Sequence, residues 1–160
     1  MRGAAWLLVG GVLSVTAALL HLAIVAGGPN WYRFFGAGEE IAHLAEAGSP
    51  LPALLTLAIA GVLFACAAYA FSAAGLLPKL PLLRPALATI SALYLLRGVV
   101  LFPALIWVPA TVDSFTIWSS LIAFLYGGVH AIATWIAWPR LTRVKSDADA
   151  TTTNSDASAM

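Results

Sequence analysis

Charged side chains are scarce in this chain. Only 9% of its 160 residues are Asp, Glu, Lys or Arg, whereas 61% are apolar; a soluble domain typically has about 25% charged residues. A water-soluble bundle of this length would need polar residues on its outer faces, but the long segments here are apolar all the way round, as helices in hydrocarbon are. The composition therefore argues against a soluble domain, and the length allows one domain only.

Cysteine and clustered basic residues are scarce as well. The single cysteine, Cys66, lies inside an apolar run, so an internal disulfide, a CxxC redox pair and a cysteine-rich zinc site are excluded. The formal net charge is only +1, and we expect no nucleic-acid partner because phosphate backbones are bound by clustered Lys and Arg. A P-loop, a dinucleotide-binding glycine fingerprint, a nucleophile elbow and an HExxH motif are all missing. Whether the protein is an enzyme is left open.

Four apolar segments are each long enough to cross a membrane. About 20 helical residues at 1.5 Å each span the roughly 30 Å of a hydrocarbon core. The first segment has no formal charge and is longer than the apolar part of a signal peptide, so we expect it to be retained. We predict an all-α fold, a four-transmembrane-helix bundle over residues 1–145, with spans at about 4–26, 52–73, 86–108 and 115–138.

The basic residues indicate an orientation. If the chain crosses four times, only Arg33 falls on one side, which we call the outer side, and positively charged loops are retained in the cytoplasm. Both termini are therefore predicted to be cytoplasmic. Residues 146–160 have almost nothing apolar to bury, so we predict a disordered cytoplasmic tail there. The basic residues on the inner side are Arg2, Lys79, Arg84, Arg140, Arg143 and Lys145.

The first outer loop, residues 27–50, predicts a short amphipathic helix at about 37–47 that suits a membrane surface. Glu39, His43 and Glu46 share one face, and apolar residues (Phe34, Ala37, Ile41 and Leu44) line the other. In one interpretation, Glu39 or Glu40 and His43 bind a metal or relay protons. We favour a solvated face whose acidic first turn suits the helix dipole, and expect no metal site. Tyr32 and Arg33, in the same loop, are further candidate site residues.

Arg97 stands near the middle of the third span, where a charge costs a few kcal/mol. Tyr94 precedes it by three residues and so shares its helix face. Glu39 or Glu40 dipping inward is one candidate counter-ion, which would make Arg97 part of a functional site. The alternative is a structural arginine satisfied by hydroxyls, carbonyls or water, or one that reaches toward lipid headgroups.

His21 and His130 lie in the first and fourth spans, on faces with small residues, so we expect both to point into the bundle. Two such histidines are the arrangement that can bind haem axially. From the outer end, however, His21 is about five residues deep and His130 about fourteen, a difference of more than about 10 Å at 1.5 Å per residue. We therefore expect neutral histidines hydrogen-bonded across helices, and leave any cofactor unknown.

Three motifs carry a resemblance to known proteins: HLAIVAGGPNWYRFFGAGEEIAHLAEAGSPLP from His21 to Pro52, YLLRG from Tyr94 to Gly98, and WSS from Trp118 to Ser120. They resemble an uncharacterised family of small bacterial four-span integral membrane proteins, over nearly the whole chain except its tail. The resemblance implies the bacterial inner (cytoplasmic) membrane and four helices, and carries no activity. In size and span count the chain is also similar to the DoxX-like proteins, some associated with oxidoreductase systems.

Three functional hypotheses remain open from the sequence. The first is a non-enzymatic membrane protein that binds a small apolar or lipid-like ligand, or a partner subunit, near the outer loop and Arg97. The second is a membrane enzyme or redox accessory protein in which Glu39, Glu40, His43 and Arg97 act on a quinone or lipid headgroup. The third is a small transporter, acting as a homo-oligomer because four helices are few for a pathway, with Arg97 as its substrate or proton site.

Overall fold

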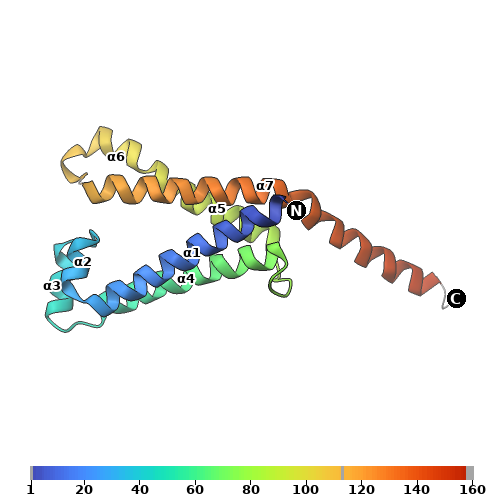
Figure 1. Ribbon diagram of the computed structural model, residues 1–160, viewed down its shortest axis with the longest axis horizontal. Helices are drawn as coiled ribbons and strands as arrows, with labels where there is room; N and C mark the ends of the chain where they lie inside the picture. The colour runs from blue at the N-terminus through green and yellow to red at the C-terminus, as the bar shows by residue number, and fades with distance from the viewer. Residues whose placement is uncertain (1, 113, 158–160) are drawn as a thin grey trace.

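The computed structural model describes the backbone of residues 2–112 and 114–157 and the side chains of residues 3–110, 112 and 114–139 (Figure 1). Within these ranges the chain is helical and has no strand. The helices are α1 (Arg2–Gly27), α2 (Pro29–Phe34), α3 (Glu39–Glu46), α4 (Leu51–Ala74), α5 (Leu83–Val99), α6 (Leu101–Trp107), the 3-10 helix η1 (Pro109–Thr111) and α7 (Ser114–Ala157).

Four helical segments are long and apolar enough to cross a membrane, so the predicted all-α, four-span fold is confirmed. They are Gly3–Gly27, Leu51–Ala74, Leu83–Trp107 and Ser114–Pro139. Their outer surfaces carry large apolar side chains, which is the surface that a bilayer requires. Among the most exposed are Leu54, Val62, Leu96, Leu125 and Trp135.

The third span is not one straight helix, which the sequence analysis did not predict. Pro103 has no N–H to donate to the carbonyl of Val99, four residues before it, and α5 ends at Val99. Hydrogen bonds across Val100 join α5 to α6 all the same, from the Val100 nitrogen to the Leu96 carbonyl and from the Ala104 nitrogen to the Val100 carbonyl. The span therefore continues in a new direction at its outer end (Figure 1).

The spans form two antiparallel pairs, α1 with α4 and α5 with α7. The pairs contact each other mainly through α1 and α7. They meet near the N-terminus and diverge toward the end that carries α3 and α6 (Figure 1). At the meeting end, Leu7, Leu87, Ala133 and Ala137 form a buried apolar cluster drawn from α1, α5 and α7.

Glycines let the helices of the second pair approach closely. A Cβ on Gly98 would lie 2.6 Å from the Phe124 Cβ, and one on Gly127 would lie 2.6 Å from the Leu95 nitrogen. Both distances are shorter than side chains tolerate, so the α5–α7 spacing depends on these two residues, as small-residue interfaces in membranes do. The predicted small-residue face of the fourth span is therefore used for packing at Gly127.

The backbone of α7 continues as a helix from the fourth span to Ala157. This range includes most of the segment, 146–160, for which the composition predicts disorder; residues 158–160 lie outside the described residues. The disorder of the tail stays a prediction.

Candidate functional site

The first outer loop folds into two short helices held together by ion pairs. Arg33, near the end of α2, donates from Nε to Glu39 Oε2 at 3.0 Å and from Nη1 to Glu46 Oε1 at 2.7 Å. His43 Nδ1 lies 3.1 Å from Glu46 Oε2, and its Nε2 lies 3.6 Å from Glu39 Oε2. The predicted face with Glu39, His43 and Glu46 is thus present, and Arg33 joins it from α2.

The charges in this loop shift one another's protonation. The hydrogen bond from Arg33 lowers the pKa of the Glu46 carboxyl below its usual value; burial opposes this, and the hydrogen bond with His43 adds to the lowering. Hydrogen bonds to Glu46 and then Glu39 raise the pKa of the Arg33 guanidinium. Both carboxylates are therefore engaged with Arg33, and the network holds α2 on α3. Across the described side chains no three His, Cys, Asp or Glu residues are grouped to hold a metal ion.

The apolar side of the loop differs in part from the predicted one. Ala42 and Tyr32 are buried against Ile24 of α1, whereas Phe34 and Leu44, expected on the apolar face, are exposed. The Tyr32 hydroxyl is buried and has no hydrogen-bond partner among the described residues. Tyr32 therefore anchors the loop on α1 through its ring, and Glu40 is exposed on the opposite side.

Arg97 is bound by α7. Its Nη1 donates to Ser120 Oγ at 2.9 Å and its Nη2 donates to Ser119 Oγ at 3.3 Å. The expected inward counter-ion is wrong for Glu39, because that carboxylate binds Arg33 on the outer loop. Within the described part of the chain Glu40 makes no hydrogen bond or ion pair with Arg97 either, and the partners of Arg97 there are neutral hydroxyls.

A buried polar cluster joins α1, α5 and α7. Ser14 Oγ lies 3.2 Å from the Tyr94 hydroxyl and 3.4 Å from His130 Nε2. His130 Nδ1 lies 3.0 Å from the Tyr126 carbonyl, which can only accept, so Nδ1 carries the proton. In a neutral ring Nε2 then accepts from Ser14, whose oxygen in turn accepts from Tyr94. The expected hydrogen bonding of His130 across helices is present.

The neighbouring residues pack closely around the His130 ring. A Cβ on Gly10 of α1 would lie 3.1 Å from His130 Cε1, so glycine makes room for the imidazole. The Tyr94 ring lies 5.2 Å from the His130 ring and 5.8 Å, edge-on, from the Tyr126 ring, measured between centroids. His130 is 2% exposed.

His21 is not part of this cluster. Its Nδ1 lies 2.8 Å from the carbonyl of Ala17 in its own helix. Ser14, which binds His130, precedes His21 by seven residues, or about 10 Å along α1 at 1.5 Å per residue. The structure therefore does not bring His21 and His130 together, and the hydrogen bond expected from His21 to another helix is wrong, because this ring bonds within α1.

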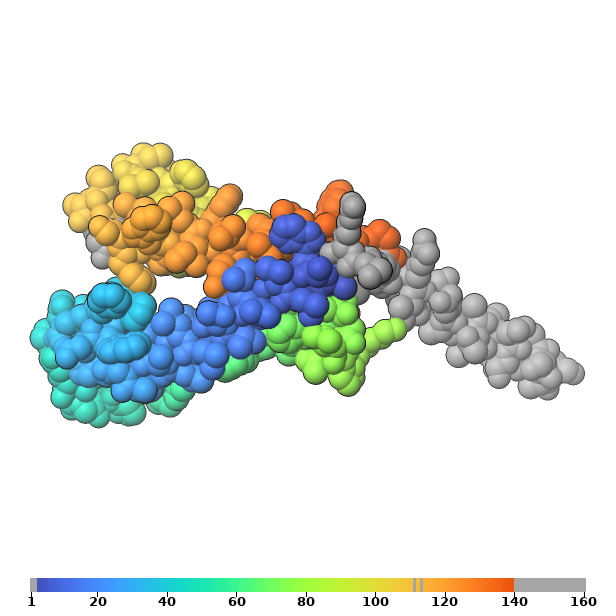
Figure 2. All heavy atoms as spheres, viewed as in Figure 1, coloured from blue at the N-terminus to red at the C-terminus, as the bar shows by residue number. Residues whose placement is uncertain are grey.

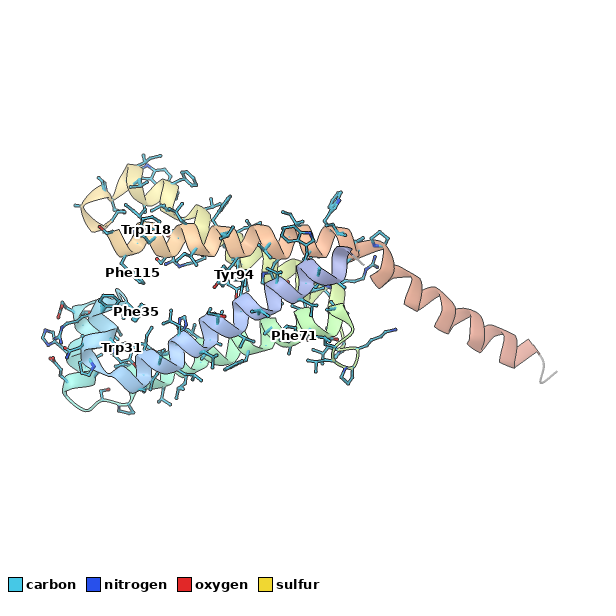
Figure 3. All side chains as sticks on the ribbon, in the orientation of Figure 1. Trp31, Phe35, Phe71, Tyr94, Phe115 and Trp118 are labelled. Carbon is cyan, nitrogen blue, oxygen red and sulfur yellow. The ribbon has the colours of Figure 1, made fainter. Side chains whose placement is uncertain are left out.

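A hollow separates the two helix pairs toward the outer end, and we call it the outer cleft (Figure 2). At its inner end lies Tyr94, and at its outer end Phe115 approaches the loop that carries Phe35 (Figure 3). The Phe115 ring lies directly against Gly36, where a Cβ would overlap it. The cleft thus has a polar floor and an aromatic mouth.

Helical spacing places Arg97 between this floor and this mouth. It follows Tyr94 by three residues on α5 and so lies on the same face, one turn nearer the outer end. Ser119, its partner on α7, is four residues after Phe115 and seven before Tyr126, spacings that place all three on one face of α7. Arg97 as a whole is exposed, although its hydrogen bond to Ser120 is partly buried.

Several of these contacts were not expected from the sequence. Ser119 and Ser120 stood out only within the WSS motif, and Ser14 was not singled out. The sequence feature that could have identified these serines is that each places a hydroxyl within an apolar span, where a buried polar atom needs a partner. The Phe115–Gly36 contact has no local signal, because it depends on how the two helix pairs meet.

Comparisons with known proteins identify no relative of this chain. No family model, no curated protein and no solved structure matches the chain. The resemblances described from the sequence therefore stay predictions.

Proposed function

We propose that this chain is an integral membrane protein of the bacterial inner membrane, with both termini cytoplasmic, that binds a small lipid-like molecule in the outer cleft. The molecule has an apolar body and an anionic or carbonyl head, and Arg97 holds the head. The observation that carries the proposal is the pair of hydrogen bonds from Arg97 to Ser119 and Ser120, deep within a span.

The two hydrogen bonds to serine do not compensate for the cost of placing the Arg97 charge within the membrane. A charged side chain near the middle of a span costs about 2.5–3.5 kcal/mol on insertion scales, and intramembrane charges usually serve a function. Serine hydroxyls orient the guanidinium but do not neutralise it. An anionic head would neutralise it, and the planar fork of Arg suits a carboxylate or phosphate.

The cleft around Arg97 favours an amphiphile over a purely polar ligand. Phe115 and Phe35 at the mouth supply apolar surface, whereas Tyr94 at the floor supplies a hydroxyl. A molecule with its head at Arg97 would place its body along the faces of α1 and α7 that line the cleft. Small-molecule sites combine apolar walls with a few polar groups in this way.

The polar cluster supports a second candidate, a redox accessory protein that acts on a quinone. Tyr94, Ser14 and His130 form a continuous hydrogen-bond chain next to the cleft. Donation runs from Tyr94 through Ser14 to His130 Nε2, so the chain can take up a proton from the hydroxyl of a quinol near Tyr94. Arg97 would stabilise the quinolate oxygen left behind, and the electrons would pass to a separate redox partner protein. This candidate shares the site and the head-group chemistry of the first and adds a reaction.

Native mass spectrometry after gentle extraction tests both candidates. Wild type is compared with Arg97→Gln, and with Glu40→Gln as a control on the exposed side of the outer loop. We expect a defined small molecule in wild type and in Glu40→Gln, and its loss in Arg97→Gln; its extracted mass and optical spectrum distinguish a lipid from a quinone. A stable complex with other chains and no small molecule would instead make the protein a structural subunit and overturn the proposal.

A further inference from the structure

A second recess lies on the lipid-facing side of the α5–α7 pair, near the inner end of the molecule. It is a groove of about 260 Å³ lined by Ala88, Ser91, Ala131, Thr134, Trp135 and Trp138. Its lining is almost wholly apolar, and Trp135, 83% exposed, stands at its edge. The volume is just below the roughly 300–1,000 Å³ of pockets that enclose a drug-sized ligand, so it suits a single chain.

One polar atom in this groove lacks a partner. Thr134 is 6% exposed, and its hydroxyl makes no hydrogen bond within the described residues. Ser91, the other hydroxyl in the lining, donates to the Leu87 carbonyl of its own helix. A buried hydroxyl without a partner is costly in hydrocarbon, so Thr134 calls for an acceptor that enters the groove from outside.

A cation stands at the inner rim of the same groove. The guanidinium of Arg84, in the first turn of α5, lies 4.6 Å from the centroid of the Trp138 ring, which itself lines the groove. Stacking on tryptophan holds a guanidinium in place, and Arg84 is half-buried where it stacks. Lys79, in the preceding loop, adds an exposed positive charge on this side.

We propose that this groove binds an anionic phospholipid, with its phosphate on Arg84 and one acyl chain along Ala88 and Ala131. Thr134 precedes Trp138 by four residues, so its hydroxyl lies about 6 Å deeper in the membrane. That is the depth of the ester carbonyls beneath a headgroup, and a carbonyl is the acceptor that Thr134 lacks. Basic residues next to a span recognise anionic headgroups in the same way.

Native mass spectrometry with defined lipids tests this site without reference to the outer cleft. Purified protein in detergent receives an equimolar mixture of phosphatidylglycerol and phosphatidylcholine, and the retained lipids are counted. Arg84→Gln removes the cation, and Ala88→Phe fills the groove from an exposed position without removing a packed side chain. Lys79→Gln and Ala65→Phe are the matched controls, the latter on the lipid-facing surface of α4.

We expect wild type and both controls to retain one phosphatidylglycerol in preference to phosphatidylcholine. Arg84→Gln and Ala88→Phe each lower that retention by about tenfold, the size expected for one charge-assisted contact or for loss of the chain site. Equal retention of the two lipids in wild type, or full retention of phosphatidylglycerol by either groove variant, would show ordinary boundary lipid only and overturn the proposal. Because Arg97 is untouched, a negative result here leaves the proposed function standing.

Discussion

The ring of Phe115, at the start of α7, lies directly on the backbone of Gly36, which follows α2. This contact joins the two helix pairs at the end where they diverge, and so closes the mouth of the outer cleft. It depends on glycine for two reasons, since Gly36 has φ +64° and a Cβ there would overlap the ring.

Gly36→Ala is therefore expected to destabilise the protein more than Gly38→Ala. Both glycines have positive φ, but a Cβ on Gly38 meets nothing within 4 Å. Each substitution costs about 1–2 kcal/mol of backbone strain, and only the first also displaces Phe115. The measurement is reversible unfolding in detergent, repeated with Phe115→Ala, which removes the ring. In the Phe115→Ala background we expect the two glycine substitutions to have equal effects, because the ring that a Cβ on Gly36 would displace is gone. Equal effects in the wild-type background would contradict the contact.

The α5–α7 spacing gives a second matched pair. Gly127→Ala places a Cβ 2.6 Å from the Leu95 nitrogen, whereas a Cβ on the adjacent Gly128 meets nothing within 4 Å. Overpacking against backbone costs about 1–3 kcal/mol, and replacing an unconstrained helical glycine by alanine stabilises by up to about 1 kcal/mol. We expect the two variants to shift the free energy of unfolding in opposite directions. A stable Gly127→Ala protein would mean that the helices are farther apart than described.

The central place of Ser14 in the buried cluster predicts unequal losses. Ser14→Ala removes the donor to His130 and the acceptor for Tyr94, whereas Tyr94→Phe leaves the Ser14–His130 bond in place. Hydrogen bonds between membrane helices average about 0.6 kcal/mol and reach about 1.7 kcal/mol. Ser14→Ala should therefore cost more than Tyr94→Phe when unfolding free energies are compared. If Tyr94→Phe were the more costly, Ser14 would not be the shared partner of Tyr94 and His130 that the structure shows.

The outer loop should become less stable in acid. The pKa of Glu46 is lower in the folded protein than in the unfolded chain, because Arg33 donates a hydrogen bond to its carboxylate. The stabilisation it provides is therefore fully present above the unfolded pKa and is lost as the pH falls through the folded pKa. The difference in unfolding free energy between wild type and Glu46→Gln should shrink on acidification. Glu40→Gln, which alters no ion pair described here, serves as the reference, and a pH-independent difference would contradict the Arg33–Glu46 bond.

Local patterns in the sequence predicted the elements but not their tertiary partners. The four spans follow from runs of apolar residues, and the face with Glu39 and His43 follows from helical spacing. The helix α2 was missed although Pro29 at its start is a helix-initiating signal. The bend before Pro103 was missed because the apolar run continues through it, which hides the lost backbone bond.

The partner of Arg97 shows why the site could not be predicted in full. Glu39 was a reasonable counter-ion on charge alone, but it lies 6 residues from Arg33, which binds it locally. Arg97 instead reaches Ser119 and Ser120, 22 and 23 residues away, because α5 packs on α7. That pairing depends on Gly98 and Gly127 meeting large neighbours on the facing helix, which no local pattern shows.

The most direct test of the central claim is the amount of small molecule that stays with the protein in wild type, Arg97→Gln and Arg97→Lys, measured by native mass spectrometry after identical extraction. If Arg97 holds an anionic or carbonyl head, the molecule is present in wild type, reduced in Arg97→Lys, which keeps the charge without the planar fork, and lost in Arg97→Gln. The same amount in all three proteins would contradict the claim and leave Arg97 as a structural residue that ties α5 to α7.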